Sequence, residues 1–304
     1  MSSSPNQLQR VVGLPGAILM GLGSIMGAGV FVSLGLGEEI AGPSVLLALA
    51  LAAVVATCNG LSSAQLAANH PVSGGTYEYG HRWLTPSLGF TAGWMFLCAK
   101  SASAATAALG FAVYLAPNYL LPISLATVTG LTVITLTGMQ RSNAVNAVIV
   151  SAVLLTLLAF MAVGSPALRT NGKLLQPFFD SNHVPELFEA TALMFVAYTG
   201  YGRIATLGEE VREPRRIIPV AIILTLGLTT LLYLGVSAVS LVHADDQGFQ
   251  SLTLLAEKMG GTTLGMALTV GAALALVSVL LNLLLGLSRV ALAMGRRGDL
   301  PEGT

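Results

Sequence analysis

Backbone groups, rather than catalytic side chains, are what this sequence offers for chemistry. The stretch from Gly21 to Phe31 reads GLGSIMGAGVF and places four glycines within nine residues of an otherwise apolar segment. Each glycine disfavours a helix by roughly 1 kcal/mol relative to alanine, so we expect the helix to be interrupted here. A break inside a membrane persists only where its freed amides and carbonyls line a cavity or hold a ligand.

A second interruption is expected from Phe195 to Gly202, in the stretch FVAYTGYG. Glycine-interrupted spans at corresponding positions of two halves of a chain indicate a transporter with inverted repeats and a binding site near the membrane midplane. The alternative is that these glycines serve close packing of helices, which is common in membrane proteins. Because the two segments lie five spans apart, we favour the transporter interpretation.

The backbone groups at the two breaks suit a zwitterion. The helical segment that begins near Ala28 presents N–H groups and the positive end of a helix dipole, which favour a carboxylate. The carbonyls near Ile25, and those from Val196 to Thr199, suit an ammonium group. Together the breaks predict a dry, charge-neutral site for an amino acid.

The elements that position these groups are expected to be membrane-spanning helices. Of the 304 residues 54% are hydrophobic and 9% are charged, and the mean hydropathy is +0.78. A span needs about 20 apolar residues, and the apolar runs are too long for the strands of a barrel. We therefore expect one all-α transmembrane domain over residues 1–304. Its eight helices would cover residues 14–34, 44–68, 88–115, 120–138, 143–164, 187–208, 217–242 and 262–288.

The positive charges fall on one side of these spans. Three cations, Arg169, Lys173 and Lys258, would lie on the outer side. The larger, cytoplasmic set would comprise Arg10, Arg82, Arg141, Arg212, Arg215, Arg216, Arg289, Arg296 and Arg297. Since cytoplasmic loops carry the excess of lysine and arginine, we expect the N-terminus to be cytoplasmic.

Lys100 is the one lysine or arginine deep inside an expected span, about 18 Å from either boundary at 1.5 Å per residue. The acidic residues all fall in loops or at the ends of spans, so the sequence offers Lys100 no obvious carboxylate. An ionisable residue at this depth is a functional candidate. It would exchange a proton during transport, or it would pair with the side chain of an acidic substrate. The alternative is a structural lysine bonded to carbonyls.

The chain resembles the amino acid–polyamine–organocation superfamily of permeases over nearly all of its length. Four motifs in the right order carry the resemblance. They are GSIMGAGVF (23–31), HPVSGGTYEYGHRW (70–83, expected as a loop), FVAYTGYGRIATLGEEVREPRRIIPVAI (195–222) and LSRVALAMGRRGDLP (287–301).

The resemblance implies two five-helix inverted repeats, discontinuous first and sixth helices, and alternating access. The second repeat would be incomplete, because this chain ends after the eighth helix and family members usually have about four more. A fragment that does not transport, or another membrane protein such as a channel, is the alternative. The candidate substrate site implied by the match comprises Ile25, Gly27, Ala28, Gly29, Val196, Ala197, Tyr198, Thr199 and Gly200.

The loop from Glu209 to Pro219 mixes both signs of charge. It is either a solvated loop or, as the resemblance suggests, an inner gate. In the second interpretation Glu210 and the arginines Arg212, Arg215 and Arg216 latch the gate.

Other classes of protein fit the sequence less well. A membrane enzyme would need a cluster of catalytic groups within the spans, and the sequence displays none. A channel would need pore-lining rings of charge or repeated filter loops, and the pair of broken helices argues against it. The four histidines are scattered without the spacing of metal ligands, so we expect no metal and no cofactor. The expected partners are an amino acid, a coupling proton or sodium ion and the lipid bilayer, with no nucleic acid.

Overall fold

The computed structural model describes residues 10–136, 139–176, 178–179, 183–243 and 251–300. Within these ranges the chain is helical, as expected, and its only strand-like pairing is an isolated parallel bridge between Val12 and Val211. The helices are α1 (Leu14–Ile25), α2 (Leu34–Ala41), α3 (Val45–Asn69), α4 (Thr76–Trp83), α5 (Pro86–Leu115), α6 (Leu120–Leu136), α7 (Met139–Asn171), α8 (Val184–Tyr198), α9 (Gly202–Ala205), α10 (Pro214–His243) and α11 (Leu252–Arg297).

Most residues of the eight expected apolar runs lie on these helices, but residues 26–27 of the first run and 206–208 of the sixth form turns. Several helices extend beyond the expected runs. The motif 70–83, expected as a loop, contains the short helix α4. Helix α11 turns at Gly261, whose φ is 70°, so its first residues form a separate short helix. The last two residues of the run 120–138 lie outside the described residues.

Among the described residues, five helical stretches are long and apolar enough to cross a membrane. This number is below eight because the stretch Leu14–Asn69 counts once, although it contains both α1 and α3. In addition, α6 has 17 residues and α8 has 15, which is short for a span considered alone.

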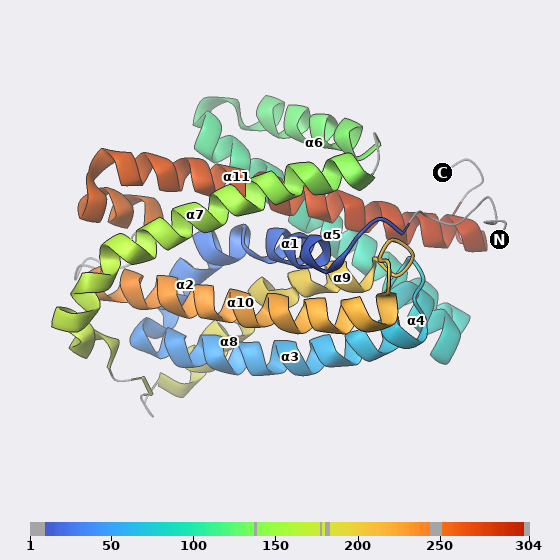
Figure 1. Cartoon of the computed structure of the whole chain (residues 1–304), viewed down its shortest axis with the longest axis horizontal. Coiled ribbons are helices and arrows are strands. Elements are labelled where there is room, and N and C mark those ends of the chain that lie inside the picture. Colours follow the sequence, from blue (N-terminus) through green and yellow to red (C-terminus); the bar gives the residue numbers. More distant parts are fainter. Residues whose placement is uncertain (1–9, 137–138, 177, 180–182, 244–250, 301–304) are drawn as a thin grey trace.

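Helix α1 lies in the middle of the bundle (Figure 1), packed against α7, α10 and α11. Helix α3 packs between α10 and α8, and α5 packs against α11 and α6. Met20, Ile25 and Met26 are almost completely buried in this arrangement. The backbone of α1 therefore changes course inside protein, where its polar groups find partners, and not in contact with lipid.

One end of the bundle collects α4, the start of α10 and the end of α11 (Figure 1), and we call it the α4 end. The segment before α1 is joined to the 206–213 loop there. The amide of Val12 donates to the carbonyl of Glu210 over 2.9 Å, and the amide of Arg212 donates to the carbonyl of Val12 over 3.0 Å.

Candidate functional site

Both glycine-rich segments change helical pitch where the sequence predicts a break. Helix α1 ends at Ile25, residues 26–27 form a turn, and the chain continues as the π-helical segment η1 (Gly29–Ser33). Helix α8 ends at Tyr198 and leads through the 3₁₀ segment η6 (Thr199–Tyr201) into α9. Neither break is an extended, unwound strand. Each one redirects a few backbone hydrogen bonds, as π-helical and 3₁₀ turns do.

Close packing explains two of the glycines at these breaks. A Cβ atom on Gly27 would lie 2.8 Å from the carbonyl oxygen of Ala275 in α11. A Cβ atom on Gly200 would lie 2.5 Å from the carbonyl oxygen of Ser24 in α1. The absence of a side chain at Gly200 thus brings the two breaks into direct contact. Gly27 and Gly200 therefore allow close helix packing and also lie at the interruptions.

A cavity of about 470 Å³ lies against both breaks. Its walls come from α1 and η1, from α5, from the α8–η6–α9 segment and from α11. The lining residues are Ser24, Ile25, Ala28, Gly29, Val32, Ser33, Lys100, Ser103, Thr106, Ala107, Gly110, Val113, Tyr114, Val196, Ala197, Thr199, Gly200, Arg203, Leu276, Val279, Asn282, Leu283 and Gly286.

The structure brings most of the sequence-predicted site residues to this cavity. Two members of the candidate set do not line it: Gly27 packs against α11, and the Tyr198 ring is buried beside the Tyr233 ring, with centroids 5.4 Å apart. The candidates that line it are Ile25, Ala28, Gly29, Lys100, Val196, Ala197, Thr199 and Gly200.

Sequence reasoning missed several polar residues of the lining. Ser103 and Tyr114 share one face of α5 with Lys100, because residues three, four or seven apart lie on the same side of a helix. This spacing along α5 could therefore have indicated, from the sequence alone, that Ser103 and Tyr114 lie on the same face as Lys100. No comparable signal pointed to Arg203 on α9 or to Asn282 on α11.

The carbonyls proposed for an ammonium group differ in how many hydrogen bonds they already accept. The carbonyl of Ile25 accepts from the Tyr233 hydroxyl over 2.9 Å. The carbonyl of Val196 accepts both the hydroxyl of Thr199, over 2.8 Å, and the amide of Thr199. A carbonyl oxygen has two lone pairs, so Ile25 retains capacity for a ligand whereas Val196 does not.

A buried polar cluster supports the first break from behind. The Asn146 amide group donates to the carbonyl of Leu19 over 3.0 Å. Its side-chain oxygen accepts from Ser278, over 3.0 Å, and from Asn282. The cluster joins α7, α11 and α1, and Asn282 also lines the cavity. It fixes the position of α1 next to the site.

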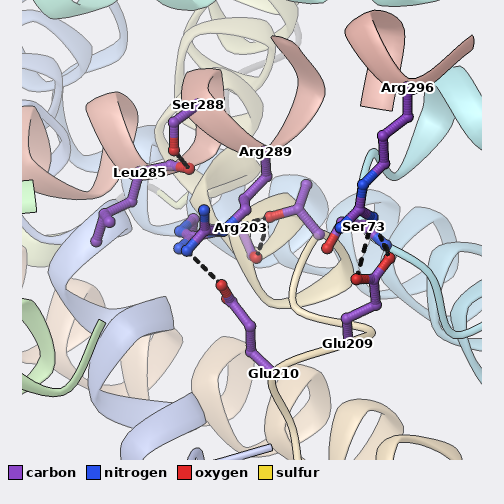
Figure 2. A network of polar contacts seen from close by, with 9 residues as sticks. Ser73, Arg203, Glu209, Glu210, Leu285, Ser288, Arg289 and Arg296 are labelled. Carbon is purple, nitrogen blue, oxygen red and sulfur yellow. Dashed lines mark hydrogen bonds and ion pairs between the residues drawn. The ribbon is translucent and has the colours of Figure 1, made fainter. Parts of the chain in front are cut away.

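Charged side chains gather below the cavity at the α4 end. Figure 2 shows Arg203, Arg289 and Glu210 pointing toward one another. Glu210 pairs with Arg289 over 2.5 Å, and Arg203 donates to the Thr206 hydroxyl over 2.7 Å. A second pair, Glu209 with Arg296 at 3.0 Å, lies beside the first.

The ion-pair partner of Glu210 is thus an arginine of α11 and not one of its own loop. Arg212, Arg215 and Arg216 are exposed, and together with Arg10 they line a groove on the surface of the α4 end.

Helix α4 docks on the end of α11 through polar contacts. Arg297 donates two hydrogen bonds to the carboxylate of Glu78, over 2.9 and 2.6 Å. The Tyr77 hydroxyl donates to Asp299 over 2.6 Å. Burial, and then this hydrogen bond, raise the pKa of Tyr77, so the hydroxyl remains a donor. These contacts hold the motif 70–83 against the charged network.

The fold and the family of the chain follow from comparison with known proteins. The chain superposes on the crystal structure of MhsT in complex with L-phenylalanine with a TM-score of 0.74 and 16% sequence identity, over 96% of this chain and 76% of that one. At this identity the likeness shows the fold. The family model described as amino acid permease matches residues 16–304.

Curated relatives agree with that match. An uncharacterized transporter of Mycobacterium tuberculosis (strain ATCC 25618 / H37Rv) is 42% identical over 302 residues, which cover 98% of this chain and 68% of the relative. The branched-chain amino acid permease BcaP of Bacillus subtilis (strain 168) is 28% identical over 329 residues, with 99% and 70% covered. The chain belongs to the amino acid permease family, which confirms the resemblance drawn from its motifs. It is an integral membrane transporter.

Proposed function

We propose that this protein is a secondary active transporter that moves amino acids or related amines by alternating access. The observation that supports this most is the contact of two interrupted helices at the wall of one cavity, made through Gly200 and Ser24. Helices broken at such a place offer backbone groups to a zwitterion. MhsT is described in complex with L-phenylalanine and BcaP is named a branched-chain amino acid permease, which supports an amino acid as substrate.

The proposed architecture is a pair of five-helix inverted repeats. The first and sixth spans are the discontinuous ones. In this arrangement the substrate lies between the repeats and is exposed in turn to each side of the membrane.

In the proposed site, the amides of Ala28 and Gly29 bind the carboxylate of the substrate. The ammonium group is bound by the Ile25 carbonyl, which has a free lone pair, and by the neighbouring groups of Ala197 and Thr199. The side chain of Val196 faces the side chain of the substrate. Gly27, Tyr198 and Gly200 give the two breaks their shape.

The proposal for the gate concerns the α4 end, which we place on the cytoplasmic side of a bacterial-type plasma membrane. Glu210 with Arg289 closes the cavity on that side, and the exposed residues Arg212, Arg215 and Arg216 flank the closure. Lys100 takes part in coupling or in substrate choice. A proton or a sodium ion is the proposed coupling ion.

Replacing Gly29 with leucine tests the binding site. A Cβ atom at Gly29 would meet the Tyr233 hydroxyl, so a leucine fits only if the backbone of the break shifts. We expect Gly29→Leu to abolish amino acid binding to the purified protein. The matched control is Gly130→Leu on α6, where nothing lies within 4 Å of an added Cβ atom.

The measurement is equilibrium binding of radiolabelled amino acids in detergent. Size-exclusion chromatography and thermal unfolding report in parallel that each variant is folded. Undiminished affinity in a folded Gly29→Leu protein would place the site elsewhere.

A further inference from the structure

Two cationic side chains, and no acidic one, line the cavity among the residues that the structure describes. Lys100 comes from α5, and Arg203 comes from α9 on the other side of the second break. A zwitterionic amino acid is neutral, and its two charges are matched by backbone groups at the breaks. It would therefore leave the positive charge of the cavity uncompensated. Charges buried away from water are unfavourable unless they are paired.

The guanidinium of Arg203 makes few hydrogen bonds to the protein itself. The residue is 6% exposed, and one nitrogen donates to Thr206. Nε and one Nη atom are buried without a hydrogen-bond partner among the described residues. Gly286 faces its stem, since a Cβ atom there would lie 3.8 Å from Cδ of Arg203. A guanidinium has five N–H donors, so the protein leaves some donors of Arg203 unused.

The acidic residues near the site are already engaged. Glu210 pairs with Arg289, so two guanidinium groups stand beside one carboxylate and the group keeps an excess positive charge (Figure 2). Glu38 accepts from Ser237 over 3.0 Å and from Ser240 over 2.7 Å on α10. Neither carboxylate lines the cavity.

Lys100 has no ion-pair partner within the described part of the chain. Its Nζ atom lies 5.9 Å from the centroid of the Phe96 ring, one turn away on the same helix. The residue is half-buried and shares the lining face of α5 with Ser103 and Ala107. The flexible four-carbon stem of a lysine at the wall of a cavity lets its ammonium group reach an anion that enters the cavity.

We infer that the site takes amino acids whose side chain carries a second anionic group, with Lys100 and Arg203 as the residues that recognise it. The inference rests on the proposed function and names its substrate class. The backbone at the breaks binds the part that all amino acids share, and the two cations bind the anionic side chain. A cavity of about 470 Å³ accommodates a substrate of this size.

The test compares L-glutamate with L-glutamine, which has nearly the same shape and a neutral side chain. Equilibrium binding to the purified protein is measured at pH 7 with each radiolabelled amino acid. We expect glutamate to bind at least about tenfold more tightly, since charge-assisted hydrogen bonds to buried cations are about twice as strong as neutral ones. The variant Lys100→Met should weaken glutamate binding at least about tenfold and change glutamine binding less than about threefold.

Three further variants keep the result interpretable. Lys100→Arg retains the charge and should retain most of the preference for glutamate. Arg203→Gln should also lower the ratio of the two affinities, and it serves if the first variant does not fold. Lys173→Met removes an exposed lysine at the far end of α7 and should change neither affinity.

The outcomes separate the inference from the proposed function. Equal or tighter binding of glutamine by the unaltered protein would overturn the inference and leave an amino acid transporter. An unchanged preference for glutamate in folded Lys100→Met and Arg203→Gln proteins would overturn the role of the two cations. Failure of the folded protein to bind any amino acid would overturn the proposed function as well.

Discussion

The carboxylate of Glu210 offsets part of the positive charge of the arginines at the α4 end. Its side chain is 2% exposed and that of its partner Arg289 is 16% exposed, so water screens the pair little. Arg203 is buried beside them (Figure 2). Removal of one member of a buried ion pair leaves the remaining charges uncompensated, which costs far more than the loss of a surface pair.

Glu210→Ala is therefore expected to destabilise the protein by about 3–5 kcal/mol, because two buried guanidinium groups lose their carboxylate. Chemical unfolding in detergent measures the free energy of unfolding. Glu213→Ala is the control in the same loop, since Glu213 is exposed and should change stability by less than about 0.5 kcal/mol. Equal effects of the two substitutions would show that Glu210 is solvated and that the pair contributes nothing.

At the scale of elements, α10 fixes the break that follows α1. The Tyr233 hydroxyl donates to the carbonyl of Ile25, and the tyrosine is fully buried. In a regular α-helix that carbonyl would accept from the amide of Gly29. A side chain of another helix thus supplies a hydrogen bond at the point where the helix changes pitch. This is how a break is tolerated at membrane depth.

Tyr233→Phe removes this hydrogen bond and nearly preserves the volume of the side chain. We expect a loss of about 1–3 kcal/mol of unfolding free energy, because the buried carbonyl loses its donor. We also expect weaker amino acid binding, because the break loses a fixed geometry. Tyr119→Phe is the control, since Tyr119 is 65% exposed. If both variants kept the stability and the affinity of the unaltered protein, the hydroxyl would have no role in shaping the site.

At the scale of the whole molecule, the fold gathers arginines at one end. The α4 end carries Arg82 and the groove around Arg10 in addition to the paired arginines of α11. At the other end of the bundle, α7 leads into the short segment that carries Lys173 (Figure 1). By the positive-inside rule, this excess of arginine favours a cytoplasmic position for the α4 end, which is part of the proposal.

Cysteine labelling tests this orientation. Cys58 and Cys98 are free and are first replaced by serine. A membrane-impermeant maleimide should label Lys173→Cys in intact cells, because Lys173 is exposed at the far end. It should label Arg82→Cys, which is exposed on α4, only after the cells are made permeable. The reverse pattern would mean that the α4 end faces outward.

The sequence by itself determined the all-helical class, the positions of both interruptions and the family. Runs of apolar residues and clusters of glycine act locally along a chain, so they can be recognised without knowing which helices meet. The motifs around Gly29 and Thr199 also carried enough of the family pattern to indicate most of the cavity wall from these two segments.

Only the tertiary structure decided which side chains meet. It placed Arg203 and Lys100 on one cavity and gave Glu210 its partner Arg289. It also showed that the Val196 carbonyl is already satisfied. These contacts depend on the rotation of each helix about its axis and on the angle at which helices cross. A span such as α6 is apolar nearly all round, so its periodicity does not reveal which face turns inward, and packing against its neighbours sets that face.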